Sequence, residues 1–139
     1  MSNLDTKQAL LTKLLATSIT GITNADIDYE NSNFVPFGKT KYIKASFLPA
    51  SSDTTGKELS APQERRGTFQ ISIYVTLNNA NYDNEQLQIS DDIELGFAYG
   101  STAAYNGKTV SILESTTNSG SENEAWYVRD LSINYLTIN

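Results

Sequence analysis

The sequence predicts an α+β domain in which two α-helices pack on one face of a mainly antiparallel β-sheet. Two observations lead to this fold class. Apolar residues recur at helical spacing in two separate segments, and they alternate with polar residues in several others. The clearest alternation places four apolar side chains on one face of a strand: Phe69, Ile71, Ile73 and Val75. The length of 139 residues suits one domain that spans the whole chain.

The first helix is expected from Asp5 to Thr17, before the helix-breaking Gly21. Its apolar stripe, most simply the side that packs on the sheet, consists of Leu4, Leu10, Leu11, Leu14 and Leu15. The segment 26–29 that follows suits a short strand.

Residues 33–38 form a loop, because Pro36 and Gly38 argue against a regular element there. The three large apolar side chains of this loop either cover the core as a flap or form an exposed contact patch. A strand is expected from residue 42 to 48, and Pro49 is expected to end it.

Residues 50–66 are polar and are expected to form one overlong hairpin loop between two strong strands. Loops longer than about 12–15 residues in compact domains are usually functional or disordered, and both interpretations stay open here. Arg65 and Arg66 stand at the base of this loop. They suit bidentate contacts with carboxylates of a neighbouring subunit, or they are exposed charges that protect a sheet edge.

A second helix is expected from Tyr82 to Phe97, with Gly96 near its end. Its spacing places one mostly apolar stripe toward the sheet and leaves the acidic residues Asp83, Glu85, Asp91 and Asp92 in solvent. The stripe consists of Gln86, Ile89, Ile93 and Phe97.

The last third of the chain is predicted to consist mainly of strands. Asn106-Gly107 is a typical pair for a two-residue type I′ hairpin turn. Strands are expected at 109–114 and 125–136, with a polar loop at 115–123. Trp126, in the final strand, is expected in the core, with an interface anchor as the alternative.

Several kinds of chemistry are excluded or disfavoured. The chain has no cysteine and no histidine, which excludes Cys/His zinc sites, thiol catalysis and His-dependent triads. The segments 38–40 and 107–109 end like a phosphate-binding loop, but Asn33 and Thr102 occupy the place of its first glycine. The acidic clusters lack the spacing of a calcium loop. We therefore expect no enzyme activity, no cofactor and no metal site.

Charge is unevenly spread along the chain. Residues 1–66 carry a net charge of +1 and residues 67–139 carry −7. Such an acidic domain is a poor nucleic-acid binder. The asymmetry either steers assembly between unlike surfaces or serves solubility. The sequence has no signal-peptide pattern and no apolar run long enough to span a membrane, so a soluble cytoplasmic protein is expected.

The order and character of these segments resemble the tail terminator family of long-tailed bacteriophages, which includes the lambda tail terminator. The resemblance covers nearly the whole chain. It rests on the leucine-striped first helix, the acidic second helix and the segments 34–37, 42–50, 65–70, 107–110 and 126–128. The second helix departs from the family pattern, because it is richer in Gln and Asp than the Ala-rich helix expected there.

The resemblance implies a subunit of a hexameric ring that caps the tail tube, stops tube polymerisation and joins the tail to the head. It implies no catalytic residues and no cofactor. The implied partners are further copies of the chain, the tail tube protein and a head-completion or connector protein. The implied location is the virion tail, assembled in the host cytoplasm. By analogy, the subunit or tube interface would include Lys57, Glu58, Glu64, Arg65 and Arg66.

Three other functions stay open at this stage. The nearest is another phage neck or tail completion protein built on a similar fold. A second is an extracellular adhesin or carbohydrate-binding module, suggested by the many Asn, Thr and Tyr residues. The third is a small hydrolase that uses carboxylates.

Overall fold

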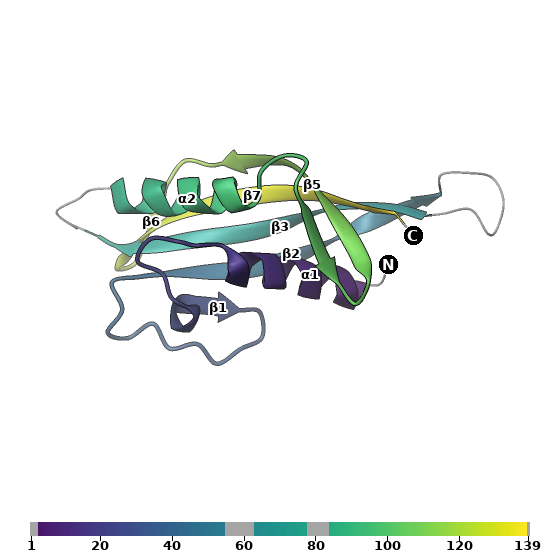
Figure 1. Ribbon diagram of the computed structural model, residues 1–139. Coiled ribbons are helices and arrows are strands. Elements are labelled where there is room, and N and C mark those ends of the chain that lie inside the picture. Colours follow the sequence, from purple (N-terminus) through teal and green to yellow (C-terminus); the bar gives the residue numbers. More distant parts are fainter. Residues whose placement is uncertain (1–2, 55–62, 78–83, 139) are drawn as a thin grey trace.

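The structure is a computed structural model that describes residues 3–54, 63–77 and 84–138. In these residues two helices cover one face of a seven-stranded sheet (Figure 1). The elements are α1 (Asn3–Ala16), the 3₁₀ helix η1 (Asn24–Asp26), β1 (Ile27–Tyr29), β2 (Lys41–Thr54), β3 (Gln63–Thr76), α2 (Asn84–Gly96), β4 (Thr102–Tyr105), β5 (Lys108–Thr117), β6 (Ser121–Asn123) and β7 (Trp126–Ile138).

The sheet confirms the predicted fold class. The strand order is β1-β2-β3-β7-β5-β4, and β6 also pairs with β7. All the pairs are antiparallel except β1 with β2, which run parallel because a long connection over residues 30–40 returns the chain to the same end. The β4–β5 hairpin folds over α1 and encloses it against the rest of the sheet (Figure 1).

The first helix confirms the predicted element but not the whole predicted stripe. Leu10 and Leu14 are fully buried, as expected, whereas Leu4 is 66% exposed and Leu15 is also exposed. Helix geometry explains the difference, because Leu4 precedes Leu10 by six residues and therefore lies about 120° away from it around the helix axis. Ala9, which the predicted stripe did not include, is also fully buried in the core.

The expectation that Pro49 ends a strand is wrong. β2 continues past it to Thr54, and β3 begins at Gln63, so much of the predicted 50–66 loop is paired strand. The pairing register shifts between Leu48 and Ser51, and this irregularity accommodates a proline that has no N–H for the ladder. Beyond residue 45, β2 is an edge strand, where proline is tolerated.

The predicted hairpin at Asn106-Gly107 is confirmed. Tyr105 pairs directly with Lys108, and both turn residues have the positive φ that a type I′ turn requires, 53° and 74°. The predicted loop at 115–123 is wrong at both ends, because β5 runs on to Thr117 and β6 occupies 121–123. Both extra pieces gain their hydrogen bonds from β7, which the polar sequence alone does not reveal.

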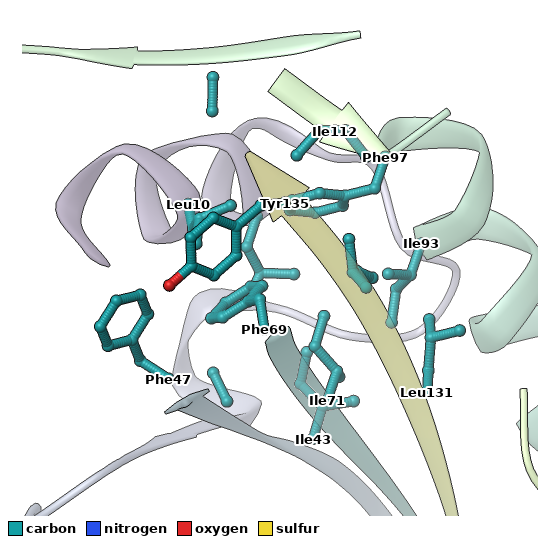
Figure 2. Packing of buried hydrophobic residues seen from close by; sticks show 14 of the residues in the cluster. Leu10, Ile43, Phe47, Phe69, Ile71, Ile93, Phe97, Ile112, Leu131 and Tyr135 are labelled. Carbon is teal, nitrogen blue, oxygen red and sulfur yellow. The ribbon is translucent and has the colours of Figure 1, made fainter. Parts of the chain in front are cut away.

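The core lies between the helices and the inner face of β2, β3, β7 and β5, where large apolar side chains point toward one another (Figure 2). The predicted stripe of α2 is confirmed as buried: Gln86, Ile89, Ile93 and Phe97. Phe69 of β3 contacts Phe97, with ring centroids 6.0 Å apart, and Tyr135 of β7 stacks on Phe47 at 5.8 Å.

Trp126 lies outside this core, contrary to expectation. Because strand residues alternate between faces, Tyr42 and Tyr74 point away from the helices. Their rings stack with centroids 4.4 Å apart, and Trp126 packs edge-on against Tyr42 at 4.9 Å. Burial is the main cause that raises the pKa of Tyr42 to about 12, and the nearby Tyr74 and Asp28 raise it further. This small aromatic cluster anchors the loop described next.

Candidate assembly surfaces

The first candidate surface is the far end of β2 and β3, here called the arm and defined as residues 51–54 and 63–66. Its strands project beyond the helices (Figure 1). Glu64 pairs with Ile138 of β7, so this end of β3 is held on both sides. Lys57 and Glu58, predicted as interface residues, lie outside the described residues.

The two arginines of the arm do not form one site. Neighbouring residues of a strand point to opposite faces, and this separates Arg65 from Arg66. Arg65 Nη1 lies 3.5 Å from Asn3 Oδ1, on the side of α1. The side chain of Arg66 is 64% exposed, and its Nε lies 2.5 Å from Glu64 Oε1. A flat partner surface can therefore engage Arg66 but not both arginines together.

Two buried polar atoms at the base of the arm lack a hydrogen-bond partner within the described part of the chain. They are Arg65 Nε and the hydroxyl of Thr137, and the two residues face each other in the β3–β7 register. Both groups are therefore available for a hydrogen bond at the base of the arm.

The second candidate surface is the loop at 33–38, at the β1–β2 edge of the sheet. Phe37 is 93% exposed and Val35 is also largely exposed, so they do not form the predicted flap on the core. Phe34 alone packs down, with its ring 5.0 Å from that of Tyr42. The alternative interpretation of the loop, an exposed apolar patch, is the one that its geometry matches.

The loop is held in a defined shape by contacts on both sides of Phe37. The Lys39 N–H donates to the Pro36 carbonyl at 3.0 Å, and Gly38 supplies the positive φ of 82° that this turn needs. Lys39 Nζ lies 2.7 Å from Asp26 Oδ1 and 5.8 Å from the ring of Phe34. Phe37 is therefore presented to solvent by an ordered turn.

The Asp26–Lys39 pair predicts an acid-sensitive contribution to stability. Burial alone would raise the pKa of Asp26, but hydrogen bonds from Lys39 and Thr23 outweigh it and hold this pKa below its usual value. A lowered folded-state pKa contributes stability at neutral pH that is lost as the pH falls below about 4.

We expect Asp26→Asn to lower the free energy of unfolding at pH 7 by less than about 1 kcal/mol, and by still less at pH 3. Urea unfolding of both proteins at the two pH values measures this difference. Asp91→Asn, at an exposed carboxylate of α2, serves as the control. An Asp26→Asn effect that grows on acidification would contradict the assignment.

The third candidate surface is a groove of about 310 Å³ between the C-terminal ends of α1 and α2. Its walls include Ala16, Asp92 and Leu95. At its floor the helices approach closely, since a Cβ on Gly96 would lie 2.4 Å from Thr17 Oγ1. The backbone N–H of Thr20, 2.8 Å from Asp92 Oδ2, is the main cause that lowers the pKa of that carboxyl.

The groove exposes an apolar side chain that the sequence did not single out, since Leu95 of its wall is 81% exposed. Leu95 does not belong to the stripe of buried residues on α2, and this position in the sequence indicates that its side chain is exposed. Sequence alone does not show that the end of α1 lies beside it.

Among the described residues no three acidic, histidine or cysteine side chains gather closely enough to hold a metal ion. No described helix is both long and apolar enough to cross a membrane. The exposed features that the structure does present are contact surfaces: the arm, the loop at 33–38 and the α1–α2 groove.

Such a fold, with exposed apolar and charged surfaces, suits a subunit of a larger assembly. The chain matches the family of phage tail terminator proteins over residues 6–135, and it belongs to that family. It is accordingly a structural protein of the phage tail and part of the virion. The family consists of structural proteins rather than enzymes, and the chain interacts with other phage structural proteins.

Solved structures support the same fold. One of them superposes with a TM-score of 0.74 at 17% sequence identity, covering 99% of this chain and 96% of that one. At this identity the likeness concerns the fold alone. A comparison with curated proteins finds no match.

Proposed function

We propose that the protein caps the growing tail tube as a ring of six subunits, stops tube polymerisation and then presents a surface to the head. Family membership across residues 6–135 is the observation that carries this proposal. The partners would be further copies of the chain, the tail tube protein and a head-completion or connector protein.

Two features of the chain support assembly into a ring. Subunits in a ring meet through two different surfaces, one on each neighbour. This chain has apolar surfaces of different shape, an exposed loop and a groove. Its first half is slightly basic and its second half strongly acidic, which favours contact between unlike surfaces.

The test is the mass of the particle in solution, by light scattering, with negative-stain images of the same sample. A hexamer of the 15.3 kDa subunit has a mass of about 92 kDa and appears as a ring. The same measurement with purified tail tubes detects a ring that needs the tube as a template. Failure to bind the tube end in that sample would overturn the proposal.

Within the arm, we assign Glu64, Arg65 and Arg66 to contacts with a neighbouring subunit or the tube, together with Lys57 and Glu58. Arg66 offers the cleanest test because its side chain is exposed. We expect Arg66→Glu to leave the subunit folded and to weaken tube binding about tenfold, measured by co-sedimentation. Lys44→Glu, the same charge change elsewhere on the sheet, is the control, and equal effects would remove Arg66 from the interface.

A further inference from the structure

We infer that Asn106 is the site at which this chain deamidates, and that the isoaspartate product opens the β4–β5 turn. The inference concerns the folded subunit and does not rest on the proposed ring. Asn106 precedes Gly107 in the turn, and it is the asparagine of this sequence that a glycine follows. That pair of residues is chemically special as well as structurally suited to the turn.

The reaction is intramolecular and needs no cofactor. The Gly107 backbone nitrogen forms a bond to Asn106 Cγ while the bond from Cγ to Nδ2 breaks. The proton of the Gly107 N–H leaves with Nδ2 as ammonia, and nothing is oxidised or reduced. Water then opens the five-membered ring at one of its two carbonyl carbons, which gives either aspartate or isoaspartate.

The geometry of the turn leaves both reacting groups accessible. Asn106 and Gly107 are exposed. Within the described residues no hydrogen bond holds the Asn106 carboxamide. Glycine has no Cβ to shield the attacking nitrogen, and a Cβ placed on Gly107 would meet nothing within 4 Å. The ring therefore has room to form without displacing a neighbouring side chain.

Other asparagines are less favourably placed. Asn118 is exposed, but a serine follows it, and hydrogen bonds hold its backbone. Its N–H donates to the Asp130 carbonyl at 2.9 Å, and its carbonyl accepts from Arg129 Nη1 at 3.0 Å. Asn134 Oδ1 is engaged by the Thr68 hydroxyl at 3.1 Å. Asn106 should therefore react before either of them.

The isoaspartate product cannot keep this turn. It adds one methylene carbon to the main chain, whereas the two-residue turn pairs Tyr105 directly with Lys108. In the described part of the sheet β4 pairs with β5 alone, and Lys13 Nζ of α1 donates to the Thr102 carbonyl at 3.0 Å. Opening the turn therefore loosens the strand that folds over α1 (Figure 1).

Incubation at mildly alkaline pH, followed by digestion and mass spectrometry, locates the reaction. We expect Asn106 to convert at least about tenfold faster than Asn118, and Gly107→Ala to slow it about tenfold because the methyl group shields the nitrogen. A faster reaction at another asparagine would overturn the inference. So would an unreacted Asn106 in the folded protein after the time in which the chain unfolded in urea reacts completely.

Hydrogen exchange tests the opening of the turn. The isoaspartate fraction carries an added negative charge and separates by ion exchange, and we expect the amides of β4 to exchange faster in it. Asn106→Asp is the matched control, since it adds the same charge without the methylene carbon and Asp-Gly suits the same turn. Unchanged exchange in the isoaspartate fraction, or equal acceleration in the control, would overturn the proposed opening.

Discussion

Replacing Gly67 with valine is expected to lower the free energy of unfolding by about 3 kcal/mol, the largest effect predicted for this protein. Gly67 faces Tyr135 across the β3–β7 ladder. A Cβ at this position would lie 2.4 Å from the Tyr135 hydroxyl oxygen and 2.8 Å from the Leu48 carbonyl oxygen. The carbonyl belongs to the backbone and the ring is buried against Phe47, so neither can move aside easily.

Urea unfolding measures the effect, and two variants test its cause. Gln70→Val, on the outward face of the same strand, is expected to change stability by less than about 0.5 kcal/mol. In a Tyr135→Ala background the additional cost of Gly67→Val should shrink, because the ring that it meets is gone. Additive costs in that double variant would contradict the proposed clash.

Replacing the buried Gln86 with methionine is expected to cost about 2 kcal/mol, although the change nearly conserves volume. Gln86 Nε2 donates to the carbonyls of Ile73 at 2.8 Å and Tyr127 at 3.1 Å. Its Oε1 accepts from Arg129 Nε at 3.0 Å. One amide therefore joins α2 to both β3 and β7, and methionine removes all three hydrogen bonds.

Gln88→Met is the matched control, because Gln88 lies on the same helix but is exposed. We expect this control to change stability by less than about 0.5 kcal/mol, as judged from the midpoint of urea unfolding. Equal losses in the two variants would show that helix propensity, and not the buried amide, determines the cost.

The elements that the sequence predicted well are those whose own residues carry the signal. The stripe from Gln86 to Phe97 repeats at helical spacing, and all four of its residues are buried. Asn106 and Gly107 carry the backbone preference of their turn within two residues. Neither feature depends on what the rest of the chain does.

The strand ends could not be predicted in the same way. Polar residues on both sides of Pro49 looked like loop, yet β2 continues through them because β3 pairs with it and β7 supports β3. The same holds for 115–117 and 121–123, which gain their partners from β7. Such hydrogen bonds join residues far apart in the chain, so local composition carries little trace of them.

The candidate surfaces also combine features that the local sequence predicts with features that only the folded chain decides. The sequence placed Arg65 and Arg66 together, and the pleat of β3 sends them to opposite faces. It also left the loop at 33–38 open between a flap and an exposed patch. The aromatic cluster of Tyr42, Tyr74 and Trp126 decides this question by binding Phe34 and leaving Phe37 outside.

The sequence by itself determined the fold class, the two helices, the hairpin turn and the resemblance to tail terminators. These follow from spacing, turn chemistry and the order of segments along the chain. Only the tertiary structure decided where the strands end, which apolar side chains remain exposed and that the ends of α1 and α2 form a groove. Those properties depend on which distant segments become neighbours, and the physical cause is burial and pairing across the sheet.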